Sequence, residues 1–216
     1  MSMQKVAVLG SGTVGEVLAN GFLKHGYAVM RGTREVQKLA AWAQGKANAS
    51  VGTFEQAAAY GDIIVLALKG SAAETVVRGL ADSLAGKVVL DATNPIADRP
   101  PQDGMISFFT TSLGDSLMER LVAAAPKAHF VKAFSSVGNA NFVNPDFGGT
   151  LPTMFICGND AAAKDKVTHV LQQFGWEAAD MGVAAAARVI EPLCILWCIP
   201  GMLHNQWTHA FKLLKR

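Results

Sequence analysis

The sequence predicts an α/β fold: a doubly wound, mainly parallel sheet followed by a short helical C-terminal segment. Apolar runs short enough for buried strands alternate with segments of helical periodicity along most of the chain, and this alternation is typical of a parallel sheet. A chain of 216 residues, 50% of them hydrophobic, supports one full core and a modest appendage. We therefore expect a main domain over residues 1–182 and C-terminal helices over residues 183–216.

The first strand is followed by the turn Gly10-Ser11-Gly12-Thr13-Val14-Gly15, which leads into a helix. In this context Gly10 permits a tight turn, Gly12 lets the backbone approach a pyrophosphate, and Gly15 lets the helix pack closely on the sheet. The phosphates would lie at the positive end of the helix dipole. The turn predicts an NAD(P)-binding Rossmann domain, and a glycine-rich connection in another α/β protein is the alternative.

The end of the second strand, residues 27–31, distinguishes the two nicotinamide cofactors. An NAD-binding fold usually carries Asp or Glu here, whereas this chain has no acid before Glu35. Arg34 can pair with a 2′-phosphate and Thr33 can add a hydroxyl, while Lys38 lies one turn further on the same face. These residues favour NADP over NAD. The alternative is that Thr33 is a plain N-cap and Arg34 a solvated side chain.

Further strands are expected to end at the same edge of the sheet, where open α/β sheets bind their ligands. Asn94 and Pro95 would form a stiff turn there, and residues 98–114 a loop over the site. Expected strands are 50–53, 63–68, 87–91, 129–134, 153–157 and 176–181. Expected helices are 34–44, 54–59, 71–84, 116–125, 160–174, 184–199 and 203–214, with an interruption at Pro200-Gly201.

Composition excludes several classes of protein. A formal net charge of +2, without a run of like charge, does not favour nucleic-acid binding. Three cysteines in apolar surroundings are typical of reduced thiols, and the N-terminus lacks the apolar region of a signal peptide. The longest apolar stretch, residues 193–203, is too short to span a bilayer. We expect a cytoplasmic protein that does not enter the membrane.

No metal site and no catalytic acid–base set is predicted. Cys194 and Cys198 share a helix face and His204 follows, but a metal site would need more ligands. Arg188 and Glu191 are expected to pair or to cap a helix. The apolar C-terminal segment would form a dimer interface or the roof of a substrate pocket, with plain core packing as the alternative.

Several segments together resemble the coenzyme F420 (deazaflavin)-dependent NADP oxidoreductase family, in order and spacing over nearly the whole chain. They are Gly10 to Gly15, Gly32-Thr33-Arg34, Asp91 to Pro95, Val131 to Phe134, Phe155 to Asp160 and Ala187 to Leu193. The fold is shared more loosely with the reductase domain of the STEAP ferric reductases and with pyrroline-5-carboxylate reductases.

The resemblance implies hydride transfer between NADPH and a deazaflavin or flavin, which depends on orienting two rings rather than on a catalytic side chain. In the family, the phosphate loop corresponds to Ser11, Gly12, Thr13 and Val14, and the 2′-phosphate pocket to Thr33, Arg34 and Lys38. The nicotinamide side corresponds to Leu68, Lys69, Asn94, Pro95 and Ala133.

The chain departs from the family pattern at Glu35, where some members have a second Arg, at Lys69-Gly70 and at Ser135-Ser136. The second substrate therefore stays open. The alternatives are an NADPH-dependent imine or ketone reductase and a non-catalytic NADP sensor that binds a partner through its apolar C-terminus. We also expect a homodimer.

Overall fold

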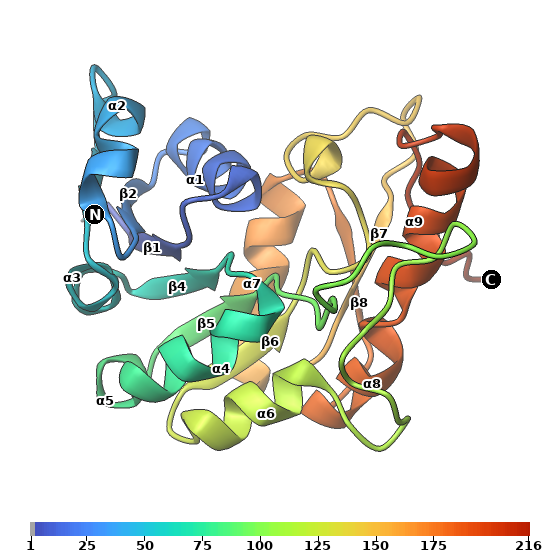
Figure 1. The fold of residues 1–216 in the computed structure, drawn as a ribbon. Helices are drawn as coiled ribbons and strands as arrows, with labels where there is room; N and C mark the ends of the chain where they lie inside the picture. Colours follow the sequence, from blue (N-terminus) through green and yellow to red (C-terminus); the bar gives the residue numbers. More distant parts are fainter. Residues whose placement is uncertain (1–2) are drawn as a thin grey trace.

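The computed structural model describes residues 3–216 and confirms the predicted fold class. Six parallel strands form one sheet in the order β3-β2-β1-β4-β5-β6, and helices cover both of its faces (Figure 1). The strands are β1 (Lys5–Leu9), β2 (Ala28–Gly32), β3 (Ala49–Gly52), β4 (Ile63–Leu66), β5 (Val88–Asp91) and β6 (His129–Lys132). The strand order reverses between β1 and β4, which is where such sheets bind a dinucleotide.

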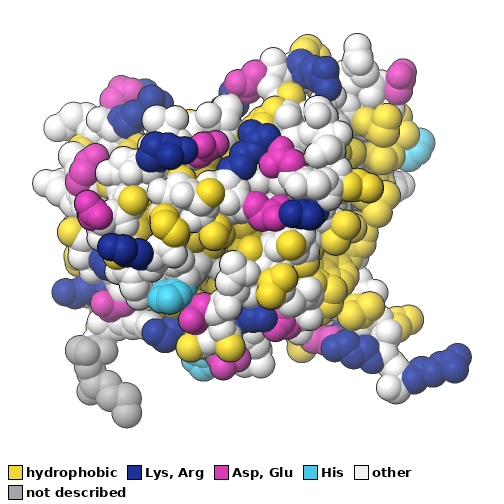
Figure 2. All heavy atoms as spheres, turned by 90° about the horizontal axis from the view of Figure 1, so that it is seen from below, with side chains coloured by type: hydrophobic (Ala, Val, Ile, Leu, Met, Phe, Trp, Pro, Cys, Tyr) yellow, Lys and Arg dark blue, Asp and Glu magenta, His cyan; other side chains and the backbone are white. Residues whose placement is uncertain are grey.

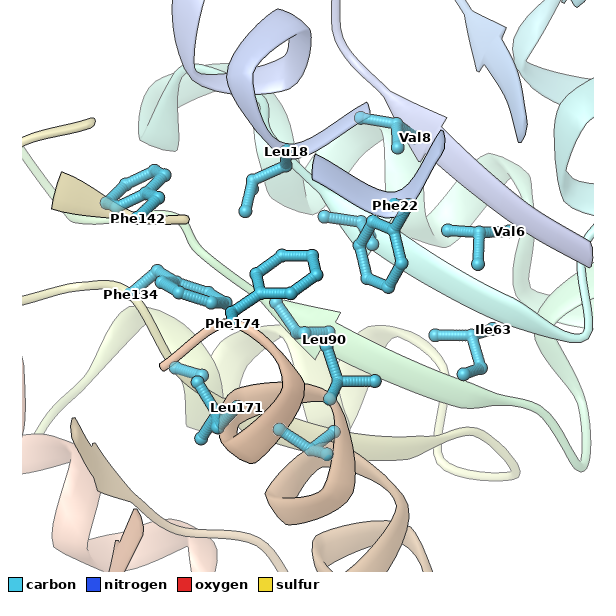
Figure 3. Packing of buried hydrophobic residues seen from close by; sticks show 14 of the residues in the cluster. Val6, Val8, Leu18, Phe22, Ile63, Leu90, Phe134, Phe142, Leu171 and Phe174 are labelled. Carbon is cyan, nitrogen blue, oxygen red and sulfur yellow. The ribbon is translucent and has the colours of Figure 1, made fainter. Parts of the chain in front are cut away.

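The central strands are buried on both faces, so their side chains divide between two hydrophobic clusters, whereas the edge strand β3 is only partly buried. In β1, Val6 and Val8 belong to one cluster, and Ala7 and Leu9 belong to the other. The first cluster lies beneath α1 (Thr13–Lys24) and α7 (Ala161–Gln173), and Figure 3 shows its packing. The second lies beneath α3 (Phe54–Tyr60), α4 (Gly70–Gly79), α5 (Ala81–Leu84) and α6 (Leu117–Ala124). Burial on both faces explains the continuous apolar runs in the sequence.

The two later strands form a sheet of their own. β7 (Thr153–Ile156) and β8 (Glu177–Asp180) pair in parallel, and an antiparallel bridge between Lys132 and Cys157 joins this pair to the end of β6. The expected strands are therefore present, but they do not continue the parallel ladder.

Two expected helices are shorter than the sequence suggests. Residues 34–44 contain only the 3-10 turn η1 (Val36–Leu39) and the short α2 (Ala40–Ala43). The segment 71–84 is divided into α4 and α5, and the division falls after Gly79, a residue type that weakens helices. The 3-10 turn η2 (Asn139–Asn141) follows β6.

The C-terminal helices differ from the prediction at Pro200. The 3-10 turn η3 (Ala184–Ala186) and α8 (Ala187–Ile190) precede α9 (Leu193–His204), which continues through this proline. Pro200 leaves the carbonyl of Leu196 without an N–H donor, and Leu196 is exposed, where water can replace that donor.

The expected helix 203–214 is absent, because Asn205 adopts the left-handed conformation and ends α9. The chain then returns in an extended form. Its Phe211 carbonyl accepts a hydrogen bond of 2.8 Å from the N–H of Thr153, and its His209 carbonyl accepts one of 2.8 Å from Trp197 Nε1.

The C-terminal helices expose an apolar surface. Figure 2 shows hydrophobic side chains gathered on the side of the molecule where α8 and α9 lie, and Val189, Leu196 and Leu203 are among the exposed ones. The helical run Ala184–His204, 21 residues with a mean hydropathy of 1.5, is by length and composition alone sufficient to cross a membrane, in contrast to the shorter stretch delimited from the sequence. A single helix of this kind is weak evidence, because helices of folded domains pass the same test. The division at residue 182 stays a prediction.

Candidate functional site

The glycine-rich turn has the geometry that the three glycines predict. Gly10 has a φ of +145°, and a Cβ there would collide with the carbonyl oxygen of Ala67. A Cβ on Gly15 would lie 2.8 Å from the Gly10 carbonyl oxygen, so the helix depends on this close approach. A Cβ on Gly12 meets nothing within 4 Å, and Gly12 is the N-cap of α1 without a capping side chain. The turn therefore presents open backbone and an uncapped helix N-terminus to solvent.

A groove of about 570 Å³ runs from this turn across the ends of β2 and β4 to α4. It brings together predicted site residues from three separate segments: Gly10, Ser11, Gly12, Thr33, Arg34, Lys38, Leu68 and Lys69. Thr13, Val14 and Gly15 form the first turn of α1 behind it. The sequence reasoning had not assigned the other lining residues to the site: Glu35, Phe54, Ala67, Ala72, Thr75 and Val76.

The far end of the groove is a cluster of charged side chains around Arg34. Thr33 is buried, and its hydroxyl accepts a hydrogen bond of 3.3 Å from the N–H of Glu35. Lys38 Nζ lies 2.8 Å from Glu35 Oε1, with 61% and 64% of the two side chains exposed. The hydrogen bond from Lys38 lowers the pKa of Glu35 below its usual value. Glu35 thus neutralises one of the two cations that face this end of the groove.

The groove is connected to the loop that follows β5 through its lining residue Lys69. Lys69 is the N-cap residue of α4, and its ammonium lies 2.5 Å from a carboxylate oxygen of Asp98. Asp98 opens the segment 98–114, which contains isolated β-bridges, turns and bends but no helix or strand, as expected for a loop. This ion pair joins the loop to the edge of the groove.

Of the residues predicted on the nicotinamide side, Leu68 and Lys69 line the groove, whereas Asn94, Pro95 and Ala133 lie outside its lining. Ala133 is fully buried in the core and Pro95 is also buried, so their side chains do not face the groove. Asn94 donates a hydrogen bond of 2.9 Å from Nδ2 to the Ser135 carbonyl, which ties the ends of β5 and β6 together. Within residues 3–216, Asn94 Oδ1 and Ser135 Oγ are buried without a hydrogen-bond partner, and the buried Phe134, two residues after the end of β6, has a φ of +60°. Strain and unpaired polar atoms at a strand end are typical of ligand sites.

A buried ionic network, missed by the sequence reasoning, lies directly beneath this edge. Lys132 Nζ lies 2.7 Å from Asp91 Oδ2, 2.9 Å from Glu191 Oε1 and 2.9 Å from the Thr93 carbonyl oxygen. The three donors of the ammonium thus face three acceptors. Glu191 also accepts the N–H groups of Leu117 and Met118 at the start of α6.

The network explains the roles left open for Arg188 and Glu191. The Glu191 carboxylate caps α6, as one alternative expected, while Arg188 pairs with Glu119 at 2.7 Å. The two carboxylates raise the pKa of Lys132 above its usual value and outweigh its burial. A charged residue inside an otherwise apolar strand was the sequence signal for this network. The same signal marks Arg31, which is fully buried behind the glycine-rich turn.

The cysteines show no arrangement for metal binding. Among residues 3–216, no group of three or more His, Cys, Asp or Glu side chains could hold a metal ion. Burial raises the pKa of the Cys157 thiol to about 12, so it stays protonated at neutral pH. Cys194 is buried beside Cys198, and the interaction between the two thiols raises the pKa of Cys194 and lowers that of Cys198.

The strand order, the glycine turn and the groove define a dinucleotide-binding protein of the Rossmann class. The sequence model of the family "NADP oxidoreductase coenzyme F420-dependent" matches residues 5–95, which contain the turn and the whole groove lining. The match covers less than half of the chain, and over these residues the chain is similar to this family of NADP oxidoreductases, as the resemblance implied.

Relatives with known sequences show a similar likeness. The chain is 29% identical over 204 residues to the metalloreductase STEAP3 of Rattus norvegicus, covering 92% of this chain and 39% of the relative. It is 28% identical over 150 residues to the F420-dependent NADP reductase of Methanocaldococcus jannaschii, covering 64% of this chain and 61% of the relative. The chain therefore spans less than two thirds of either relative.

Solved structures share the fold over most of the chain. A candidate F420-dependent NADP reductase from Arthrobacter sp. FB24 superposes with a TM-score of 0.89 at 28% identity, covering 97% of this chain and 99% of that one. An imine reductase of Streptomyces aurantiacus gives a TM-score of 0.66 at 21% identity, covering 93% and 63%. At that identity the second likeness shows the fold alone.

Proposed function

We propose that this chain binds NADP(H) and transfers a hydride between NADPH and a deazaflavin or flavin-type acceptor. The single observation that carries the proposal is the groove that leads from the open glycine turn to Arg34 and Lys38. No carboxylate precedes Glu35 at the end of β2 to hold the ribose hydroxyls of NAD. The names of the F420-dependent relatives support the choice of acceptor.

The residues present fit a dinucleotide. The space above Gly12, where an added Cβ would meet nothing, leaves room for a pyrophosphate against the N-terminus of α1. Arg34 and Lys38 supply charge for a 2′-phosphate, and the Thr33 hydroxyl lies beside them. When bound, the cofactor supplies the hydride, and the protein supplies binding and orientation.

The side chains around the groove are those of a site that binds and orients a cofactor. In the described part of the chain its lining contains no His, Cys or Tyr, and its one carboxylate, Glu35, is exposed and paired with Lys38. Transfer between two planar rings depends on proximity and orientation rather than on proton transfer from a side chain. We therefore assign no catalytic residue.

The proposal is tested by following NADPH oxidation with oxidised deazaflavin, FMN, FAD and a ferric chelate as acceptors, with NADH in parallel. Turnover with a deazaflavin or flavin and a preference for NADPH is the expected result. Turnover of imines or ketones but not of flavins would identify the imine reductase alternative, which shares the fold. Tight NADPH binding without turnover of any acceptor would favour the sensor.

We also propose that the exposed apolar surface of α8 and α9 is covered by a second copy of the chain in the cytoplasm. Large hydrophobic side chains on one face support an interface, because such patches are rare on monomers. Light scattering coupled to size exclusion should give twice the mass of the chain. A monomer for the wild type, or a dimer that persists when Leu196 and Leu203 are both changed to Glu, would contradict this proposal.

A further inference from the structure

Arg31 is a fully buried charged residue at the end of β2, immediately behind the glycine-rich turn. Its Nη2 donates hydrogen bonds to the carbonyl oxygens of Gly12 at 3.1 Å and of Gly10 at 3.4 Å. Its Nη1 lies 3.5 Å from Glu16 Oε2, and its guanidinium lies 5.1 Å from the centre of the Trp42 ring. A buried cation is costly unless it is paired, so these contacts need an explanation.

The two carbonyls belong to peptide groups whose N–H groups are those of Ser11 and Thr13. In a trans peptide the N–H points away from the C=O, so donors that hold both carbonyls behind the turn direct both N–H groups to the other side. That side is the groove, because Gly10, Ser11 and Gly12 line it whereas Arg31 does not. Arg31 therefore holds the turn in the orientation in which it can bind an anion, together with the N–H of Glu16, which donates a hydrogen bond of 3.0 Å to the Gly12 carbonyl.

The positive charge of Arg31 also favours the binding of an anion at the turn. Its neighbour Glu16 lies in the first turn of α1, where a carboxylate would repel the pyrophosphate of a bound nucleotide. Pairing with Arg31 turns this carboxylate towards the guanidinium. The ring of Trp42, held by a 2.9 Å hydrogen bond from Nε1 to Asn20 Oδ1, bounds the guanidinium on another side.

We propose that Arg31 is a positioning residue for the pyrophosphate: it orients the glycine-rich turn from behind and neutralises Glu16. The inference rests on the proposed function and assigns a role to a residue outside the family motif. It predicts that Arg31 contributes to the binding of the pyrophosphate and that Arg34 contributes to the binding of the 2′-phosphate.

Two fragments of the cofactor separate these roles in a direct binding measurement. ADP-ribose contains the pyrophosphate without a 2′-phosphate, and 2′-AMP contains the 2′-phosphate without a pyrophosphate. Arg31→Met should weaken ADP-ribose about tenfold to a hundredfold, the loss expected for charged hydrogen bonds, and leave 2′-AMP within about twofold. Arg34→Ala should weaken the binding of 2′-AMP and leave the binding of ADP-ribose nearly unchanged.

Two further variants keep the test decisive if Arg31→Met unfolds. Arg31→Lys retains the charge but cannot donate to both carbonyls in the fixed arrangement of a guanidinium. Its affinity for ADP-ribose should therefore fall less than that of Arg31→Met, and its affinity for 2′-AMP should stay nearly unchanged. Glu16→Gln removes an exposed carboxylate and should tighten ADP-ribose at low salt.

The outcomes distinguish this inference from the proposed function. Arg31 variants that keep the wild-type melting temperature and bind both fragments normally, or lose both equally, would overturn the positioning role. A Glu16→Gln variant that does not bind ADP-ribose more tightly would also count against it. A wild-type protein that binds neither fragment nor NADPH would instead refute the proposed function.

Discussion

The two halves of the sheet use charge in opposite ways at the same edge. At the end of β2, Arg34 and Lys38 are exposed and face a groove. At the ends of β5 and β6, Lys132 and Asp91 are fully buried and face each other. The first arrangement leaves cations available to a ligand, whereas the second uses a cation to hold segments of the chain together.

The difference follows from solvation. An exposed ion pair such as Lys38–Glu35 contributes little to stability, so a phosphate can replace the carboxylate at small cost. A buried ion pair has already lost its water, and removing one partner leaves the other charge without compensation. The buried network therefore connects β5, β6, α6 and the C-terminal helices firmly, through Asp91, Lys132 and Glu191.

The largest effect is expected for Lys132→Met, which removes the cation from between Asp91 and Glu191. The free energy of unfolding should fall by about 3–5 kcal/mol, because two buried carboxylates lose their partner. Chemical denaturation followed by tryptophan fluorescence measures this change.

Lys38→Met is the matched control, because it removes an exposed lysine from an ion pair of similar length. The free energy of unfolding should change by less than about 1 kcal/mol. Equal destabilisation by Lys132→Met and Lys38→Met would contradict the distinction between a buried ion pair that holds the chain together and an exposed pair that does not.

Gly12→Val should weaken both NADPH and NADH by at least about a hundredfold while the fold is retained. The added side chain occupies the space above the turn, where its Cβ meets no protein atom within 4 Å. Titration calorimetry measures the binding.

Gly79→Ala is the control for this substitution, because its Cβ also meets nothing within 4 Å but lies in α4 away from the turn. It should bind both cofactors normally. Normal binding by Gly12→Val would separate the glycine turn from cofactor binding.

Arg34→Ala should weaken NADPH by about 1.5–3 kcal/mol and leave NADH nearly unchanged, because only the 2′-phosphate loses a charged hydrogen bond. The dissociation constants of both cofactors, compared between variant and wild type, measure the effect. Equal losses for NADPH and NADH would place Arg34 outside a 2′-phosphate pocket.

The smallest effect is expected for Glu35→Gln. This change releases Lys38 and removes a carboxylate from the phosphate end of the groove. NADPH should bind a few-fold more tightly, and the gain should shrink as salt is added. Weaker NADPH binding would indicate that Glu35 contributes to the site instead of opposing the phosphate.

The parallel core and many of the residues that line the groove could be predicted, because each depends on local sequence. Gly10, Gly12 and Gly15 lie within one turn, and the strands buried on both faces are continuous apolar runs. The position of Arg34 after β2 also follows from the strand that precedes it. The structure brings these segments together along one groove.

The remaining features depend on contacts between distant segments, which no local pattern encodes. Lys132 reaches Glu191 across 59 positions (191 − 132), and this network is visible only once the C-terminal helices pack against α6. The helix expected over residues 203–214 fails for a similar reason, because the tail pairs with Thr153. The family resemblance placed Ala133 and Pro95 on the nicotinamide side, and in the structure their side chains are buried outside the groove lining.

The central claim is that the exposed charges after β2 select NADP. The most direct test is titration of the wild-type protein with NADPH and with NADH at low ionic strength. The account predicts that NADPH binds at least about tenfold more tightly, as a charged contact to the 2′-phosphate implies. Equal affinities, or tighter binding of NADH, would contradict it.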